Sequence, residues 1–149
     1  MEVTINKKSV PLKFNFKALF EANKKFSSKD ENGNNLGDGA TNLFTRLVMN
    51  DELVIPDIIT IAGNVGNATE DDLFAAVDEL TDNGEKIDDV LDELKDELKN
   101  SGFFVKSIKT QQKNLEEALP IMEKKADTDG KKQQLESVKR IQKLLNDNL

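Results

Sequence analysis

The sequence lacks cysteine, histidine, tryptophan and tyrosine altogether. Without cysteine there is no disulfide framework, and without cysteine and histidine the usual zinc ligands are missing. Nucleophilic catalysis by Cys–His or Ser–His–Asp groups is excluded for the same reason. Acidic residues are plentiful, but they fall on polar helix faces where nothing desolvates a carboxylate enough to raise its pKa. We therefore expect that the protein is not an enzyme and that it has no metal site and no cofactor.

Long apolar runs are also absent. The most apolar stretch, residues 53–65, is interrupted by Pro56, Asp57 and Gly63 and is too short to span a bilayer. Residues 1–4 lack the basic start and apolar core of a secretory signal. The 28 acidic residues outnumber the 21 basic ones, for a net charge of −7, which disfavours binding to nucleic acid or to an anionic membrane. The sequence predicts a protein of the cytoplasm.

The first residues alternate between apolar and polar side chains. Val3 and Ile5 precede a polar segment at residues 6–9, and Val10, Leu12 and Phe14 continue the alternation after it. This period of two predicts a β-hairpin over residues 2–14 with one apolar face. Because an isolated hairpin is marginally stable in water, we expect helices or another copy of the sheet to cover that face.

The remainder of the chain has helical periodicity. The 149 residues suffice for one domain, and we expect an α+β fold that is mostly α, with the N-terminal hairpin followed by a bundle of about five to seven helices. Pro56 suits the first turn of one helix, and Pro120 is expected to kink or end another. The predicted helical segments are residues 16–26, 43–48, 56–62, 70–80, 87–98, 103–122 and 135–149.

Two of the intervening patterns are informative. Thr69, followed by Asp72 three residues later, indicates a capping box at the start of a helix, whose buried stripe we expect to include Phe74. Residues 27–41 are polar and rich in Gly and Asn, which predicts a mobile surface loop. The start of this loop, residues 30–34, is similar to a calcium loop, but the required Gly and Glu are missing at later positions.

Charge is unevenly distributed along the chain. Residues 69–97 contain thirteen acidic residues and two lysines, whereas residues 1–50 and 105–149 each carry a balance of +3. The acidic residues either line the solvated faces of two helices or form a surface that docks a basic partner. The candidate docking residues are Asp71, Asp78, Asp82, Asp89, Asp92, Glu93 and Asp96.

Two apolar stripes are candidates for partner binding, because an amphipathic stripe can pack against a helix of another protein. The alternatives are that both stripes complete the chain's own core, or that the tail of one copy covers a groove on the next copy in a homo-oligomer. The candidate residues are Phe103, Phe104, Val105 and Ile108 in the first stripe and Leu135, Val138, Ile141 and Leu145 in the second.

The order of these elements is more distinctive than any single motif. A predicted strand pair leads through Phe14-Asn15-Phe16-Lys17 into the first helix; Thr69-Glu70-Asp71-Asp72-Leu73 opens a later helix; and an acidic helix ends near Ser101-Gly102-Phe103. Over about residues 1–105, this arrangement resembles the tail assembly chaperones of long-tailed bacteriophages that infect Gram-positive bacteria.

The resemblance implies a non-enzymatic protein that binds the phage tape measure protein, keeps it soluble and helps to recruit tail tube subunits. It implies action in the host cytoplasm and absence from the mature virion. Residues 1–105 would form the hairpin and helical chaperone domain, and residues 106–149 a helical extension packed on it or on a neighbouring subunit. The alternatives are a small structural virion protein of the head–tail connector type and an acidic protein-binding regulator.

Overall fold

The computed structural model describes all 149 residues and confirms the predicted fold class, with an antiparallel hairpin followed by seven helices. The strands are β1 (Glu2–Ile5) and β2 (Lys8–Pro11). The helices are α1 (Phe16–Phe26), α2 (Gly39–Val48), α3 (Val54–Ala62), α4 (Glu70–Leu80), α5 (Ile87–Asn100), α6 (Gly102–Lys125) and α7 (Asp129–Asn148).

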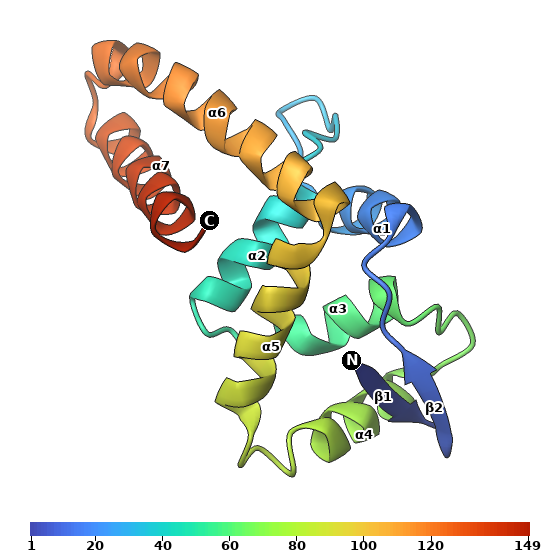
Figure 1. Ribbon diagram of the computed structural model, residues 1–149. Coiled ribbons are helices and arrows are strands. Elements are labelled where there is room, and N and C mark those ends of the chain that lie inside the picture. The colour runs from blue at the N-terminus through green and yellow to red at the C-terminus, as the bar shows by residue number, and fades with distance from the viewer.

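The elements are arranged around α2, which contacts α1, α3, α5, α6 and α7 (Figure 1). The hairpin and α4 lie at one end of the molecule, and the far part of the α6–α7 pair projects from the other end (Figure 1). The side chains of Leu43, Phe44 and Leu47 on α2 are completely buried. Helix α3 is apolar nearly all round and is central in the core, as its sequence predicts. No helix is both long and apolar enough to cross a membrane.

The hairpin is tighter than its sequence suggests. Asn6 and Lys7 both have positive φ angles, 53° and 66°, and form a two-residue turn, so that Lys8 and Ser9 of the polar segment belong to β2. Helix α4 packs against β1 and covers the buried Val3 and Ile5. The apolar face of the hairpin is therefore covered by a helix of the same chain.

Small residues allow α1 and α2 to pack closely. Ala18 and Ala22 on α1 and Gly39 and Ala40 on α2 are all buried. A Cβ atom added to Gly39 would lie 2.6 Å from the carbonyl carbon of Ala22 and 2.8 Å from the Cα atom of Asn23, closer than real Cβ atoms approach. The backbones of the two helices thus meet at a position that only glycine fits.

The segment between α1 and α2 is exposed, as predicted, but it ends at residue 38 and is tied to both helices. The Asn35 side-chain amide donates a hydrogen bond to the Asn23 carbonyl oxygen (2.8 Å), and the backbone N–H of Gly39 donates to Ser27 Oγ (2.9 Å). The carboxylate of Asp30 accepts hydrogen bonds from Asn34 and Asn32, which lower the pKa of Asp30. The Asp30 carboxylate thus stabilises the turn at residues 30–34. The mobility of this segment stays a prediction.

Helix α4 begins with the predicted capping box. The Asp72 N–H donates to Thr69 Oγ1 (3.1 Å) and the Thr69 N–H donates to Asp72 Oδ2 (3.0 Å), so that the pKa of Asp72 lies below its ordinary value. The prediction for Phe74 was wrong, because its side chain is 52% exposed. Helix α4 buries Ala76 and packs Leu73, Val77 and Leu80 against the core, whereas Phe74 lies outside this contact.

The C-terminal helices form a long antiparallel pair. Helix α6 continues through residue 105, where the sequence suggested a domain boundary, and extends past Pro120 to Lys125, so Pro120 does not end the helix. The missing N–H of Pro120 deprives only the carbonyl of Glu116 of a partner, and both residues are exposed to water. Helix α7 packs along α6 and reaches α2 through the fully buried Leu145.

One arginine joins α2 to α3. Arg46 Nε donates to Asp51 Oδ2 (2.8 Å) and Arg46 Nη1 donates to Asp57 Oδ2 (2.7 Å). Partial burial acts to lower the pKa of Arg46, but the hydrogen bonds to both carboxylates outweigh it and raise that pKa. The hydrogen bond from Arg46 lowers the pKa of Asp51. Asp51 therefore stabilises the fold while it is ionised.

Replacement of Gly39 tests the contact between α1 and α2. We expect Gly39→Ala to lower the free energy of unfolding by about 1–3 kcal/mol, because the added methyl group forces the two backbones apart. Gly130→Ala is the control, since nothing lies within 4 Å of a Cβ at Gly130. That variant should be about 0.5–1 kcal/mol more stable than the wild type, as expected for Ala in a helix. Urea unfolding followed by circular dichroism measures both, and equal effects would contradict the contact.

The Arg46 ion pair predicts a pH dependence. Because the pKa of Asp51 is lower in the folded than in the unfolded state, its contribution is present at neutral pH and is lost as the pH falls below about 4. Asp51→Asn should be less stable than the wild type at neutral pH, and the difference should shrink on acidification. Urea unfolding at neutral pH and at a pH below about 4 is the measurement. The control, Asp147→Asn, removes only an exposed pair with Lys143 and should change stability little at either pH.

Candidate functional site

The structure buries most of the predicted partner-binding stripes. Phe104, Ile108 and Leu145 are completely buried, Leu135 is 8% exposed, and Val105, Val138 and Ile141 are partly buried. Phe103 is the exception, with 48% of its side chain exposed. In this conformation a partner can reach the first stripe mainly through Phe103.

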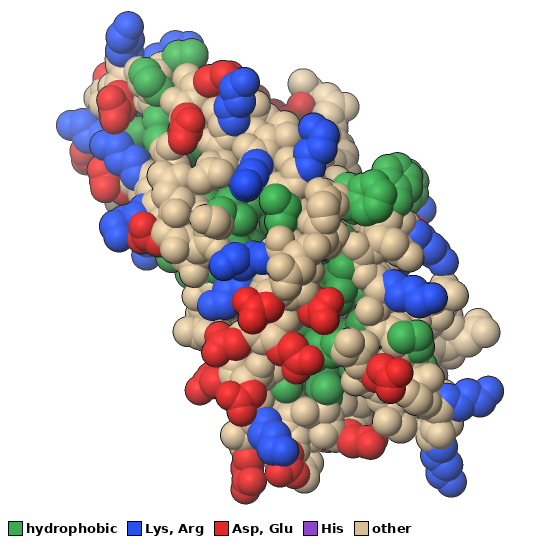
Figure 2. Space-filling view, in the orientation of Figure 1, with side chains coloured by type: hydrophobic (Ala, Val, Ile, Leu, Met, Phe, Trp, Pro, Cys, Tyr) green, Lys and Arg blue, Asp and Glu red, His purple; other side chains and the backbone are tan.

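Two other phenylalanines join Phe103 at the surface. Phe16 and Phe20 on α1 are 62% and 57% exposed, and the rings of Phe16 and Phe103 pack edge to face with centroids 5.6 Å apart. Together with the partly buried Leu19, they form what we call the aromatic face, which belongs to α1 and the first turn of α6. Figure 2 shows large hydrophobic side chains protruding over α1.

The aromatic face is hollowed on both sides of Phe16. One groove, of about 620 Å³, runs between α1 and the start of α6, and a second, of about 360 Å³, runs between α1 and the loop at Asn35. Phe16 and Leu19 line both, so the two grooves adjoin each other on α1. Lys106 lines the first groove and Lys24 the second, and no acidic side chain lines either.

Helix geometry explains why these side chains point outward. Residues at i and i+4 share a face, so Phe16 and Phe20 lie together, while the small side chains of Ala18 and Ala22 lie on the side that packs against α2. Asn15 caps the helix by accepting a hydrogen bond from the Ala18 N–H (3.1 Å). Phe16 and Phe20 thus lie on the side of α1 that faces away from α2.

Ser101 brings Phe103 to this face. Its hydroxyl donates to the carbonyl oxygen of Phe14 (2.7 Å) and accepts from the N–H of Phe104 (3.4 Å), so one side chain caps α6 and ties it to the segment before α1. Beneath the surface, the rings of Phe14 and Phe104 pack edge to face with centroids 5.9 Å apart. The hydrogen bond between Ser101 and Phe14 thus joins two segments that are 87 positions apart in the sequence.

Sequence reasoning assigned Phe16 and Phe20 to the first helix but not to a binding site. The signal that could have found them is a helix with apolar residues on two faces, one of them made of alanines. Alanines can pack closely against another backbone, whereas two phenylalanines on the opposite face then have no core to enter. Phe103 was already a candidate from the sequence, but its place beside Phe16 is set by tertiary contacts.

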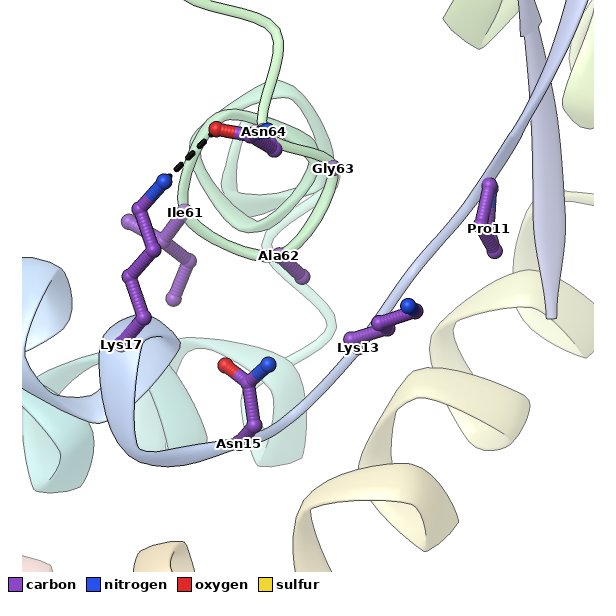
Figure 3. A pocket seen from close by; sticks show the side chains of 8 residues that line it. All are labelled: Pro11, Lys13, Asn15, Lys17, Ile61, Ala62, Gly63 and Asn64. Atoms are coloured by element: carbon purple, nitrogen blue, oxygen red, sulfur yellow. Dashed lines mark hydrogen bonds between the residues drawn. The ribbon is translucent and has the colours of Figure 1, made fainter.

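A small polar hollow of about 320 Å³ lies between the end of α3 and the segment that leads into α1 (Figure 3). Lys17 Nζ donates to Asn64 Oδ1 (2.7 Å), and the backbone N–H of Lys13 donates to the carbonyl oxygen of Ala62 (2.9 Å). These bonds join the end of α3 to the segment before α1, which indicates a structural role. No group of three acidic side chains in the chain is placed to hold a metal ion.

The predicted acidic docking residues are all exposed and belong to α4, α5 and the turn between them. Figure 2 shows acidic side chains gathered over α5, whereas basic side chains are frequent over α6 and α7. The uneven charge of the sequence is therefore also an uneven charge of the surface. Its role in docking a partner stays a prediction.

Comparison with known families decides the assignment. The model of the phage tail assembly chaperone protein family, TAC, matches residues 2–114. The chain belongs to this family. The match confirms the resemblance in the sequence and extends it from about residue 105 into the middle of α6. Neither the comparison with curated proteins nor that with solved structures finds a match.

The match contains the whole aromatic face of this tail assembly chaperone. Phe16, Phe20 and Phe103, both grooves and the two lysines lie within residues 2–114. The last part of α6, residues 115–125, and all of α7 lie beyond the end of the match. The candidate site thus belongs to the family domain and not to the C-terminal helices.

Substitution of one exposed and one buried phenylalanine tests whether the aromatic face is surface or core. Phe20→Gln should change the free energy of unfolding by no more than about 0.5 kcal/mol, because the ring is mostly in water and Gln favours helix. Phe104→Ala should cost about 3–5 kcal/mol, because it leaves a cavity. Urea unfolding measures both. A large loss with Phe20→Gln would place this ring in the core.

Proposed function

We propose that this tail assembly chaperone binds the phage tape measure protein and keeps it soluble, acting without catalysis in the host cytoplasm. Membership of the family supports the general role, and the aromatic face supplies the surface. A protein that holds an apolar client needs accessible apolar side chains that do not cause its own aggregation. Three phenylalanines grouped at one place, on a chain with 28 acidic and 21 basic residues, meet both requirements.

The size of the aromatic face suits transient binding. Covering a half-exposed phenylalanine contributes about 1 kcal/mol, so three rings contribute about 3 kcal/mol before the entropic cost of association. One such site binds a client weakly. Several chaperones can occupy separate segments of one long client, and each binds and dissociates independently of the others. Such binding would protect the client until tube subunits replace the chaperone.

The acidic surface on α4 and α5 is available for a second task, the recruitment of tail tube subunits. It lies on other helices than the aromatic face, so a chaperone that holds its client can still attract a basic partner. Complementary charge raises the rate of association more than the affinity and weakens with salt. We propose that tail tube subunits are recruited in this way.

Co-expression with a tape measure fragment tests the proposal. The fragment should be mostly insoluble alone and soluble with the wild-type chain. The double variant Phe20→Gln/Phe103→Gln should lose most of this effect, because two of the three exposed rings are gone. Phe74→Gln is the matched control: it removes an equally exposed ring on α4 and should behave as the wild type. The soluble fraction on a denaturing gel is the measurement.

Two outcomes would contradict the proposal. A fragment that stays insoluble with stoichiometric wild-type chain would rule out the holding function. Mass spectrometry of purified virions is the second measurement, because the proposal requires the chain to be absent from them. Its stoichiometric presence would instead indicate a structural virion protein.

A further inference from the structure

We infer that the aromatic face takes a helical client segment with an apolar stripe and acidic residues at both ends. This inference rests on the proposed function and specifies the chemistry of the client. It follows from the shape of the groove and from the charges around it.

The charges around the groove are unusual for this chain. Acidic residues exceed basic ones by seven overall, yet none lines either groove, and each groove is lined by one lysine, Lys24 in one and Lys106 in the other. Neither Lys24 nor Lys106 forms an ion pair within the chain, so both ammonium groups are free to meet a partner's carboxylates. A client with basic ends would be repelled at both positions.

The lining of the groove favours a helix over an extended segment. The grooves are lined by helices α1 and α6 and by Asn35, and no strand borders them. An extended segment would find no strand edge here with which to pair its backbone, whereas a helix satisfies its own backbone groups. From Phe16 to Lys24, α1 rises about 12 Å, so a client helix of a little over two turns spans this part of the face.

Such a helix places its side chains to match both features. Apolar residues at i, i+3 or i+4 and i+7 lie on one face and can contact the three exposed rings. Carboxylates one turn beyond either end of this stripe then come near Lys24 and Lys106. The apolar contacts supply most of the affinity, and the two charge pairs determine which amphipathic helices are accepted.

Two designed peptides of about 18 residues test this inference. They share one leucine stripe at helical spacing and differ only at the ends, which carry glutamates in one peptide and lysines in the other. Fluorescence anisotropy with the full-length chain measures the dissociation constants at low salt. We expect the wild type to bind the glutamate-ended peptide about tenfold more tightly. Lys24→Glu/Lys106→Glu should reverse the preference.

Controls separate the groove from other surfaces. Lys124→Glu/Lys132→Glu makes the same change in net charge at the far end of the α6–α7 pair, where neither lysine is in an ion pair, and should keep the wild-type preference. Phe20→Gln should weaken both peptides, and Phe74→Gln should weaken neither. A preference that reverses in the distant double variant, or that fails to reverse in Lys24→Glu/Lys106→Glu, overturns the inference.

Other outcomes distinguish this inference from the proposed function. If the wild type solubilises the tape measure fragment but binds both peptides equally, the holding function stands and the acidic client is wrong. If sedimentation shows that the chain self-associates and that Phe20→Gln/Phe103→Gln disperses it, the occupant is a second copy, and the inference is overturned. Failure of the wild type to solubilise the fragment contradicts the proposed function itself, whatever the peptides do.

Discussion

The close contact between α1 and α2 is the constraint on which the rest of the structure depends. It requires Gly39 at the start of α2 and alanines on the inner side of α1, because larger side chains would separate the backbones. Once α2 is seated there, its buried side chains Phe44 and Leu47 form the centre around which α3, α5, α6 and α7 pack. A loss of this contact would disturb every other helix interface of α2.

The same constraint produces the surface that we propose binds the client. A helix that uses alanines against its neighbour has its phenylalanines on the other side, so Phe16 and Phe20 remain exposed without any cost to the core. Ser101 then brings Phe103 beside them through its hydrogen bond to the Phe14 carbonyl. Stability and the proposed binding therefore use opposite sides of α1.

Charge complements this arrangement. The acidic residues shown in Figure 2 gather over α5, while lysines are the only charged residues that line the grooves. An apolar contribution of about 3 kcal/mol at each site, before the entropic cost of association, suits a partner that must later be released. Weak contacts repeated along a long client are compatible with both protection and removal.

The sequence by itself determined the elements of this protein. Alternation at Val3 and Ile5 predicted the hairpin, the spacing of Thr69 and Asp72 predicted the capping box, and Asn100-Ser101-Gly102 separated α5 from α6. These features depend on neighbours within a few residues, so the local pattern suffices. The order of the elements also sufficed to indicate the family, which the match to residues 2–114 confirms.

Only the tertiary structure decided which apolar residues are available to a partner. Phe103 and Phe104 are adjacent in the sequence, yet one is 48% exposed and the other is completely buried, because burial depends on where α1 and α2 lie. Phe74 was expected inside and lies outside for the same reason. Periodicity shows that a helix has an apolar side, but the number and position of its neighbours determine how much of that side they cover. The aromatic face joins residues from α1 and α6 and exists only after the chain has folded.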